Sequence, residues 1–108
     1  MITIDYIKAN QQENKHIRIM KEMFIFIDDL IDERNFKAID DFIEEFCKED
    51  MCLQYYICLL TASHWVKNGL NNIEMLKTKA KEVAVKEIGE KNALKVLKFY
   101  TFDYDKIT

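Results

Sequence analysis

The fold is decided by residues 51–66, MCLQYYICLLTASHWV, the longest stretch of the chain without Asp, Glu, Lys or Arg. Its 16 residues are fewer than the about 20 that a helix needs to cross a bilayer. When the segment is wound as a helix, apolar and weakly polar residues cover almost every side, which is typical of a helix packed on several sides. We therefore predict a buried central helix over 51–67, with Leu53, Ile57 and Leu60 nearly inaccessible to water.

Amphipathic helices are predicted on both sides of this segment. Hydrophobic residues recur at steps of three and four in 12–33, 36–48, 72–88 and 90–99, a spacing that places them on one helical face. The predicted buried faces are Ile17, Met20, Phe24, Ile27 and Ile31 in the first; Phe36, Ile39, Phe42, Ile43, Phe46 and Cys47 in the second; Ile73, Leu76, Ala80, Val83 and Ala84 in the third; Ala93, Leu94, Val96 and Leu97 in the fourth. The expected N-caps are Asn35, Asp50 and Asn71, the last with Glu74 in a capping box, and the expected helix stops are Gly69 and Gly89.

Composition supports a helical fold. The 108 residues include no Pro and two Gly, whereas a β-protein draws on both for its many turns. Hydrophobic residues make up 49% of the chain and charged residues 32%, which supplies both a core and a solvated surface. We predict an all-α single domain spanning 1–108, a compact bundle of four to five helices in antiparallel hairpins, with 1–11 and 100–108 as terminal extensions.

The two termini leave alternatives open. Ile2, Ile4 and Tyr6 alternate with polar residues, as do Tyr100, Phe102 and Tyr104, and a period of two is the pattern of a half-buried strand. One interpretation is a frayed N-terminus and an aromatic tail docked on the bundle. The other is a pair of short strand-like termini that pair within or between chains.

Charge is unevenly distributed along the chain. Residues 28–50 hold ten acids and three bases, for a net charge of −7, whereas 67–98 hold eight Lys and four Glu, for a net charge of +4. In one interpretation these opposed stretches meet across a boundary with a protein partner or a second copy, where complementary charge fixes register and speeds encounter. In the other they face one another inside a single chain, with the tail folded back. The residues expected to take part in an interaction across such a boundary are Trp65, Lys91, Lys95, Lys98, Tyr100, Phe102 and Tyr104.

A small accessory protein-interaction module is therefore the function that the sequence favours, with self-association into a homo-oligomer expected. The alternative is a nucleic-acid-associated protein, in which the lysines at 91, 95 and 98 contact phosphates and the neighbouring aromatic residues stack on bases. Nucleic acid is the less favoured partner, because the chain has a net charge of −3 and a pI near 5.4, and most such domains are basic.

No catalytic, cofactor-binding or metal-binding residue is predicted. Cys47, Cys52, Cys58 and His64 are separated by five, six and six residues. Positions six apart on a helix point about 240° apart, so Cys52, Cys58 and His64 do not all face one ion. A Cys–His pair for nucleophilic catalysis would need folding to bring Cys47 to His16 or to His64. We expect all three cysteines to pack as small hydrophobes and the chain not to be an enzyme.

Residues 33–90 contain, in this order, Glu33-Arg34-Asn35-Phe36, Ile39-Asp40, Phe42-Ile43, Leu59-Leu60-Thr61-Ala62-Ser63, Val66-Lys67, Leu70, Asn72, Leu76, Val83 and Gly89-Glu90. In these residues the chain resembles small uncharacterised helical proteins of bacteriophage and prophage genomes. The resemblance implies a helical fold and an accessory role, and it carries over no functional residue.

The expected location is the cytoplasm, with no association with a membrane. Residues 1–8 carry Asp5 and lack the charged-then-apolar layout of a signal peptide. An odd number of cysteines, each among apolar neighbours, fits a reducing compartment.

Overall fold

The computed structural model describes residues 2–12, 15–64 and 66–107, with side chains except at residue 67 and residues 100–107. Within these ranges the chain forms helices and no strand, which confirms the all-α prediction. The elements are α1 (Ile4–Ala9), α2 (His16–Asp32), α3 (Phe36–Lys48), α4 (Leu53–His64), the 3₁₀ turn η2 (Lys67–Gly69), α5 (Ile73–Ile88) and α6 (Glu90–Ile107).

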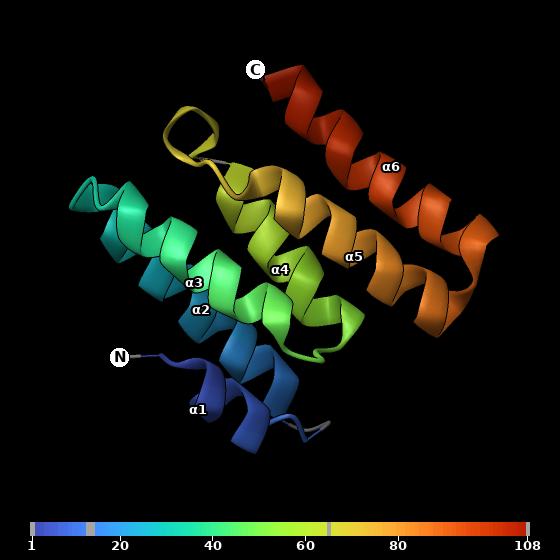
Figure 1. Ribbon diagram of the computed structural model, residues 1–108, viewed down its shortest axis with the longest axis horizontal. Helices are drawn as coiled ribbons and strands as arrows, with labels where there is room; N and C mark the ends of the chain where they lie inside the picture. The colour runs from blue at the N-terminus through green and yellow to red at the C-terminus, as the bar shows by residue number, and fades with distance from the viewer. Residues whose placement is uncertain (1, 13–14, 65, 108) are drawn as a thin grey trace.

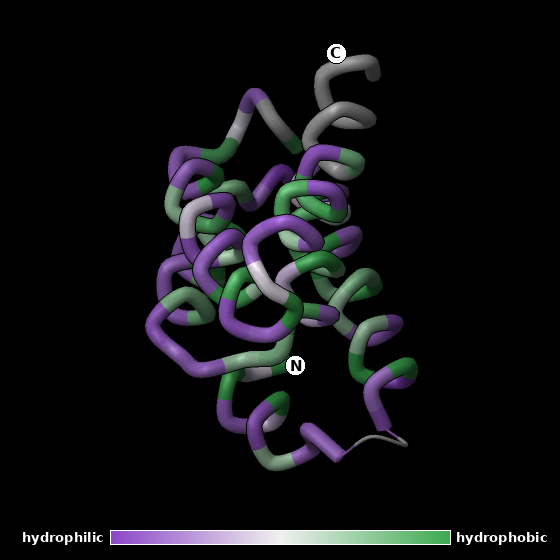
Figure 2. Tube along the Cα trace, turned by 90° about the vertical axis from the view of Figure 1, so that its right-hand side faces the viewer, coloured by the Kyte–Doolittle hydropathy of each residue, from purple (hydrophilic) through white to green (hydrophobic). Residues whose placement is uncertain are grey.

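Successive helices from α2 to α6 run in opposite directions, so the bundle consists of antiparallel hairpins (Figure 1). Helix α5 packs against α3, α4 and α6, and α2 packs against α3 and α4. The radius of gyration, 13.2 Å, matches the about 13 Å expected of a compact domain of this length. Hydrophobic and hydrophilic residues alternate along the helices, which shows the amphipathic pattern on which the packing depends (Figure 2).

The central helix is α4, as predicted, but the identity of its most buried residues differs from the prediction. Leu53 is buried as predicted, but Ile57 and Leu60 are partly exposed, and the fully buried residues are Tyr55, Tyr56 and Leu59. A helix with apolar residues on almost every side gives no periodic signal for its most buried stripe. Only the neighbouring helices decide that stripe, since α4 is covered by α2 and α5 and only lightly by α6.

The predicted buried faces agree with the structure better for α3 and α5 than for α2. Those of α3 and α5 are confirmed in the main, since Ile43 and Phe46 in α3 and Leu76 and Ala84 in α5 are all fully buried. The predicted stripe of α2 was wrong at Ile17, which is 67% exposed. Ile27 of that stripe is fully buried as predicted, and α2 also buries Ile19 and Met23, because its many apolar residues support more than one stripe.

Two helix starts are stabilised by carboxylates from distant helices. Asp40, a buried residue of α3, accepts hydrogen bonds from the backbone N–H groups of Asn71 and Asn72 at 2.8–3.1 Å, at the start of α5. Glu87 of α5 accepts from the N–H of Leu53, the first residue of α4, at 3.1 and 3.2 Å. The predicted caps Asp50 and Asn71 were therefore wrong. The carboxylates that accept these hydrogen bonds belong to residues that are distant in sequence and become neighbours only in the folded chain.

Asn35 caps α3 as predicted, since its side-chain oxygen accepts from the N–H of Ala38 at 3.3 Å. Gly89 ends α5 as predicted, with a φ of 84° that favours glycine. Gly69 does not end α4, which stops at His64, but lies at the end of η2. There a Cβ atom would come within 2.6 Å of the Phe36 ring.

Neither alternative for the N-terminus is correct, since it is neither frayed nor a strand, and the strand alternative for the C-terminus is wrong. Residues Ile4–Ala9 form α1, whose Ile7 is fully buried, and Thr3 caps this helix by accepting from the N–H of Tyr6. The backbone of residues 100–107 continues α6 instead of forming a strand or a separate tail. The alternative that the aromatic tail docks on the bundle concerns side chains outside the described set. Among the described residues, no helix is both long enough and apolar enough to cross a membrane.

Candidate interaction surfaces

The outer face of α6 carries three lysines around a large apolar side chain. Ala93 is fully buried and Leu97 is partly buried against the core, so this side of α6 faces the bundle. Lys91, Lys95 and Lys98 lie on the opposite side and are exposed, and Leu94 beside them is 50% exposed. We call Lys91, Leu94, Lys95 and Lys98 the basic face.

The structure thus brings together the three lysines that the sequence singled out. The expected burial of Leu94 was wrong, because one side of α6 has no neighbouring helix to cover it (Figure 1). Phe99, next along the helix, is 61% exposed. The other predicted interaction residues fall outside what the structure describes: Trp65 entirely, and Tyr100, Phe102 and Tyr104 in their side chains.

A second surface lies between the N-terminal segment and α2. Its hollow, of about 410 Å³, is lined by Ile2, Tyr6, Glu22, Ile25, Phe26 and Asp29. We call this the α1–α2 groove. Its apolar part includes Ile25, which is 61% exposed, and its two carboxylates are Glu22 and Asp29. Sequence reasoning missed it, because the segment that forms one wall was taken for a frayed end or a strand.

The electrostatics of the α1–α2 groove are acidic. A hydrogen bond to the Glu22 carboxylate, with burial, raises the pKa of the Tyr6 hydroxyl. Arg18 Nε lies 3.8 Å from Glu22 Oε1, and both side chains are largely exposed, so this ion pair is easily exchanged for another. Further along α2, Asp28, Asp29 and Asp32 are exposed, and the last turn of the helix carries no basic residue.

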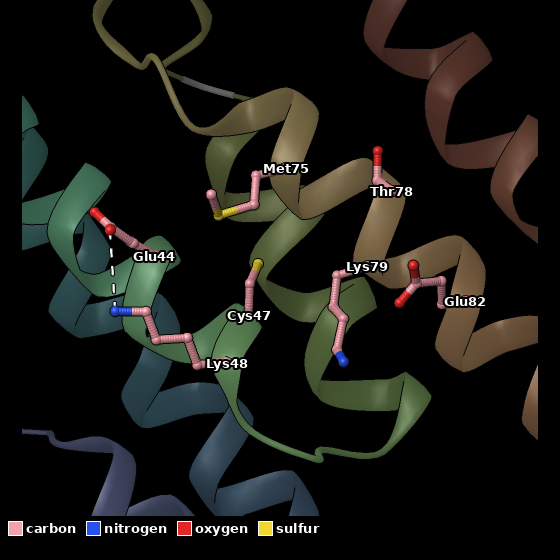
Figure 3. Close-up of a pocket in the computed structure, with 7 residues that line it drawn as sticks. All are labelled: Glu44, Cys47, Lys48, Met75, Thr78, Lys79 and Glu82. Carbon is pink, nitrogen blue, oxygen red and sulfur yellow. Dashed lines mark ion pairs between the residues drawn. The ribbon is translucent and has the colours of Figure 1, made fainter.

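A third hollow, of about 350 Å³, lies between α3 and α5 (Figure 3). Cys47 from α3 and Met75 from α5 line its apolar part, and Glu44, Lys48, Lys79 and Glu82 surround them. Lys48 Nζ lies 3.9 Å from Glu44 Oε1. Since acids and bases alternate here, the hollow has no charge preference of its own.

The cysteines are buried or half-buried thiols. Burial raises the pKa of Cys47 to about 11 and that of Cys58 to about 12, and it also raises the pKa of Cys52. Folding brings His16 to Cys52, with 3.9 Å between Nδ1 and Sγ, and not to Cys47. A raised pKa favours the protonated thiol near neutral pH.

Within the described part of the chain, no three His, Cys, Asp or Glu side chains gather as they would around an ion. Comparison of the chain with protein-family models, with curated proteins and with solved structures gives no match.

Proposed function

We propose that this chain is a protein–protein interaction module, without a catalytic role, that binds its partner through the basic face of α6. The observation that carries the proposal is the exposure of Leu94 among three lysines on an outer helix. Interfaces combine a desolvated apolar anchor with polar neighbours, and here the exposed Leu94 borders a row of three lysines. We further propose, from the resemblance of residues 33–90, that the module is an accessory protein of a phage or mobile element and works in the cytoplasm.

The basic face determines the chemistry of the partner surface that would fit it. A partner that contacts this face needs acidic groups spaced to meet the lysines at 91, 95 and 98 and an apolar recess for Leu94. The same lysine row supports a second candidate, a single-stranded nucleic acid held by phosphate contacts. Protein is the favoured partner, because a half-exposed leucine gains more from an apolar recess than from a sugar–phosphate backbone.

The two candidates differ in their salt dependence and in the role of Leu94. Binding of a fluorescent single-stranded oligonucleotide should be weak and should not depend on Leu94→Ala if the partner is a protein. A tight complex that weakens steeply with salt would favour the nucleic-acid candidate instead, since phosphate binding releases counterions.

The direct test is capture of a partner from the source cells, after nuclease treatment, by the tagged chain and by two variants. Leu94→Asp places a charge in the centre of the basic face and should abolish capture. Lys81→Glu changes an exposed lysine of α5 outside the basic face and should leave capture intact. Capture that is equal for all three proteins would overturn the assignment of the interaction to α6.

A further inference from the structure

The α1–α2 groove complements the basic face in chemistry. The groove offers two carboxylates, Glu22 and Asp29, with apolar surface from Ile25 and Phe26 between them. The basic face offers lysines with Leu94 between them. Each surface exposes an apolar side chain that its own fold leaves at least half uncovered.

The two surfaces also match in spacing. Glu22 and Asp29 are seven residues apart on α2, and Lys91 and Lys98 are seven residues apart on α6. Seven residues of helix span about 10.5 Å. When the two helices lie side by side, each terminal lysine therefore meets a carboxylate while Leu94 lies at the level of Ile25 and Phe26. The match holds for either direction of α6.

The basic face and the α1–α2 groove of one chain do not contact each other. Helix α6 lies at one edge of the bundle, and α1 and α2 lie at the opposite edge (Figure 1). A copy that inserts its basic face into a neighbour therefore still presents its own groove to a third copy. Such a contact between unlike surfaces is heterologous, and it builds rings or open chains instead of a two-fold dimer.

We propose that the basic face of one copy docks into the α1–α2 groove of a second copy, so that the protein assembles head to tail. This rests on the proposed function and names the chain itself as a partner. The lysines displace the long, exposed contact between Arg18 and Glu22 and pair with Asp29, for which the structure describes no ion pair within the chain.

The test uses full-length variants that each lose one of the two surfaces. Leu94→Asp with Lys95→Glu removes the basic face, and Ile25→Asp with Asp29→Lys removes the groove. All four positions are exposed, so the fold should persist, and circular dichroism checks this. If a double variant unfolds, Lys98→Glu and Asp29→Lys alone replace it. Mass is measured by light scattering from low micromolar to submillimolar concentration.

Wild-type protein should grow beyond two copies as concentration rises, and each variant alone should weaken association at least roughly tenfold. An equimolar mixture of the two variants should form a complex of two copies that grows no further, because one intact groove and one intact basic face remain. Lys81→Glu should behave as wild type.

Monomeric wild-type protein throughout the range, or a mixture that stays monomeric, would overturn head-to-tail assembly. A variant that still dimerises alone would overturn it in favour of a two-fold contact elsewhere. Neither result would change the outcome of the capture experiment, in which Leu94 contacts another protein. Head-to-tail assembly and the proposed function can therefore be contradicted independently.

Discussion

The close approach of the Phe36 ring to the backbone restricts position 69 to glycine. A Cβ at this position would lie 2.6 Å from Cγ of Phe36, an atom that rotation of the ring does not move away. We expect Gly69→Ala to lower the free energy of unfolding by about 1–3 kcal/mol, as overpacking does. Urea denaturation measures the loss. The same substitution in a Phe36→Ala background should cost clearly less, and an equal cost in both backgrounds would contradict the close contact.

Cys58 makes the free energy of unfolding depend on pH in the alkaline range. Burial raises the pKa of its thiol to about 12, and the thiol donates to the carbonyl of Met20 at 3.5 Å. In the unfolded chain the thiol titrates near its ordinary value of about 8.5, so the folded protein binds this proton more tightly. The contribution is fully present below that ordinary value and is lost as the pH rises toward 12.

The expected loss from Cys58 is about 1 kcal/mol per pH unit in this window. Denaturant titrations at several alkaline pH values, compared between wild type and Cys58→Ala, measure it. The variant should lose less stability per pH unit than wild type, whatever its stability near neutral pH. Identical slopes would show that the thiol does not titrate differently in the two states.

At the scale of an element, α5 begins where a carboxylate of α3 holds it. Asp40 accepts from two N–H groups that have no partner within α5, and a negative charge there also favours a helix start. Asp40→Asn should cost about 1–3 kcal/mol, because a buried acceptor becomes a donor beside N–H groups. Asp41→Asn is the matched control on the exposed side of α3 and should cost within about 0.5 kcal/mol. Similar losses in the two variants would contradict the anchoring role.

Two adjacent leucines of α4 differ in burial. Leu59 is fully buried and Leu60 is partly exposed, although the two are adjacent and chemically identical. Leu59→Ala should therefore cost about 2–5 kcal/mol, as truncation in a packed core does, and Leu60→Ala should cost distinctly less. Thermal and urea unfolding compare the two. A larger loss for Leu60 would mean that the central helix is rotated about its axis.

At the scale of the whole molecule, charge is separated between the edges of the bundle. Helix α2, which carries exposed acids, and α6, which carries the exposed lysines, lie at opposite edges of the bundle (Figure 1), and the net charge of the chain is −3. Head-to-tail assembly should therefore weaken as NaCl is added, because charges at an exposed rim are screened beyond about 8 Å at physiological ionic strength. Sedimentation velocity at low and high salt measures it. Association that strengthens with salt would indicate apolar contacts without the charge pairing.

The sequence by itself determined the helical class, the bounds of α3, its Asn35 cap and the Gly89 stop. These follow from local chemistry: hydrophobic spacing within one helix, a side-chain oxygen near the N–H of Ala38, and a positive φ that glycine adopts freely. It also located the lysine row of α6, since three lysines at steps of four and three share a face wherever the helix lies. The period of two at the C-terminus was misleading, because Ala93, Leu97, Tyr100 and Tyr104 recur at steps of four, three and four, and the backbone there is helical.

Only the tertiary structure decided which apolar side chains are buried and which remain exposed. Ile25 and Leu94 are as hydrophobic as the residues of the core, but no neighbouring helix covers them. The same holds for Asp40, whose carboxylate reaches the start of α5 from 31 and 32 residues away in the chain. Burial and long-range hydrogen bonds depend on which helices become neighbours, and the periodicity of one helix carries no information about that choice.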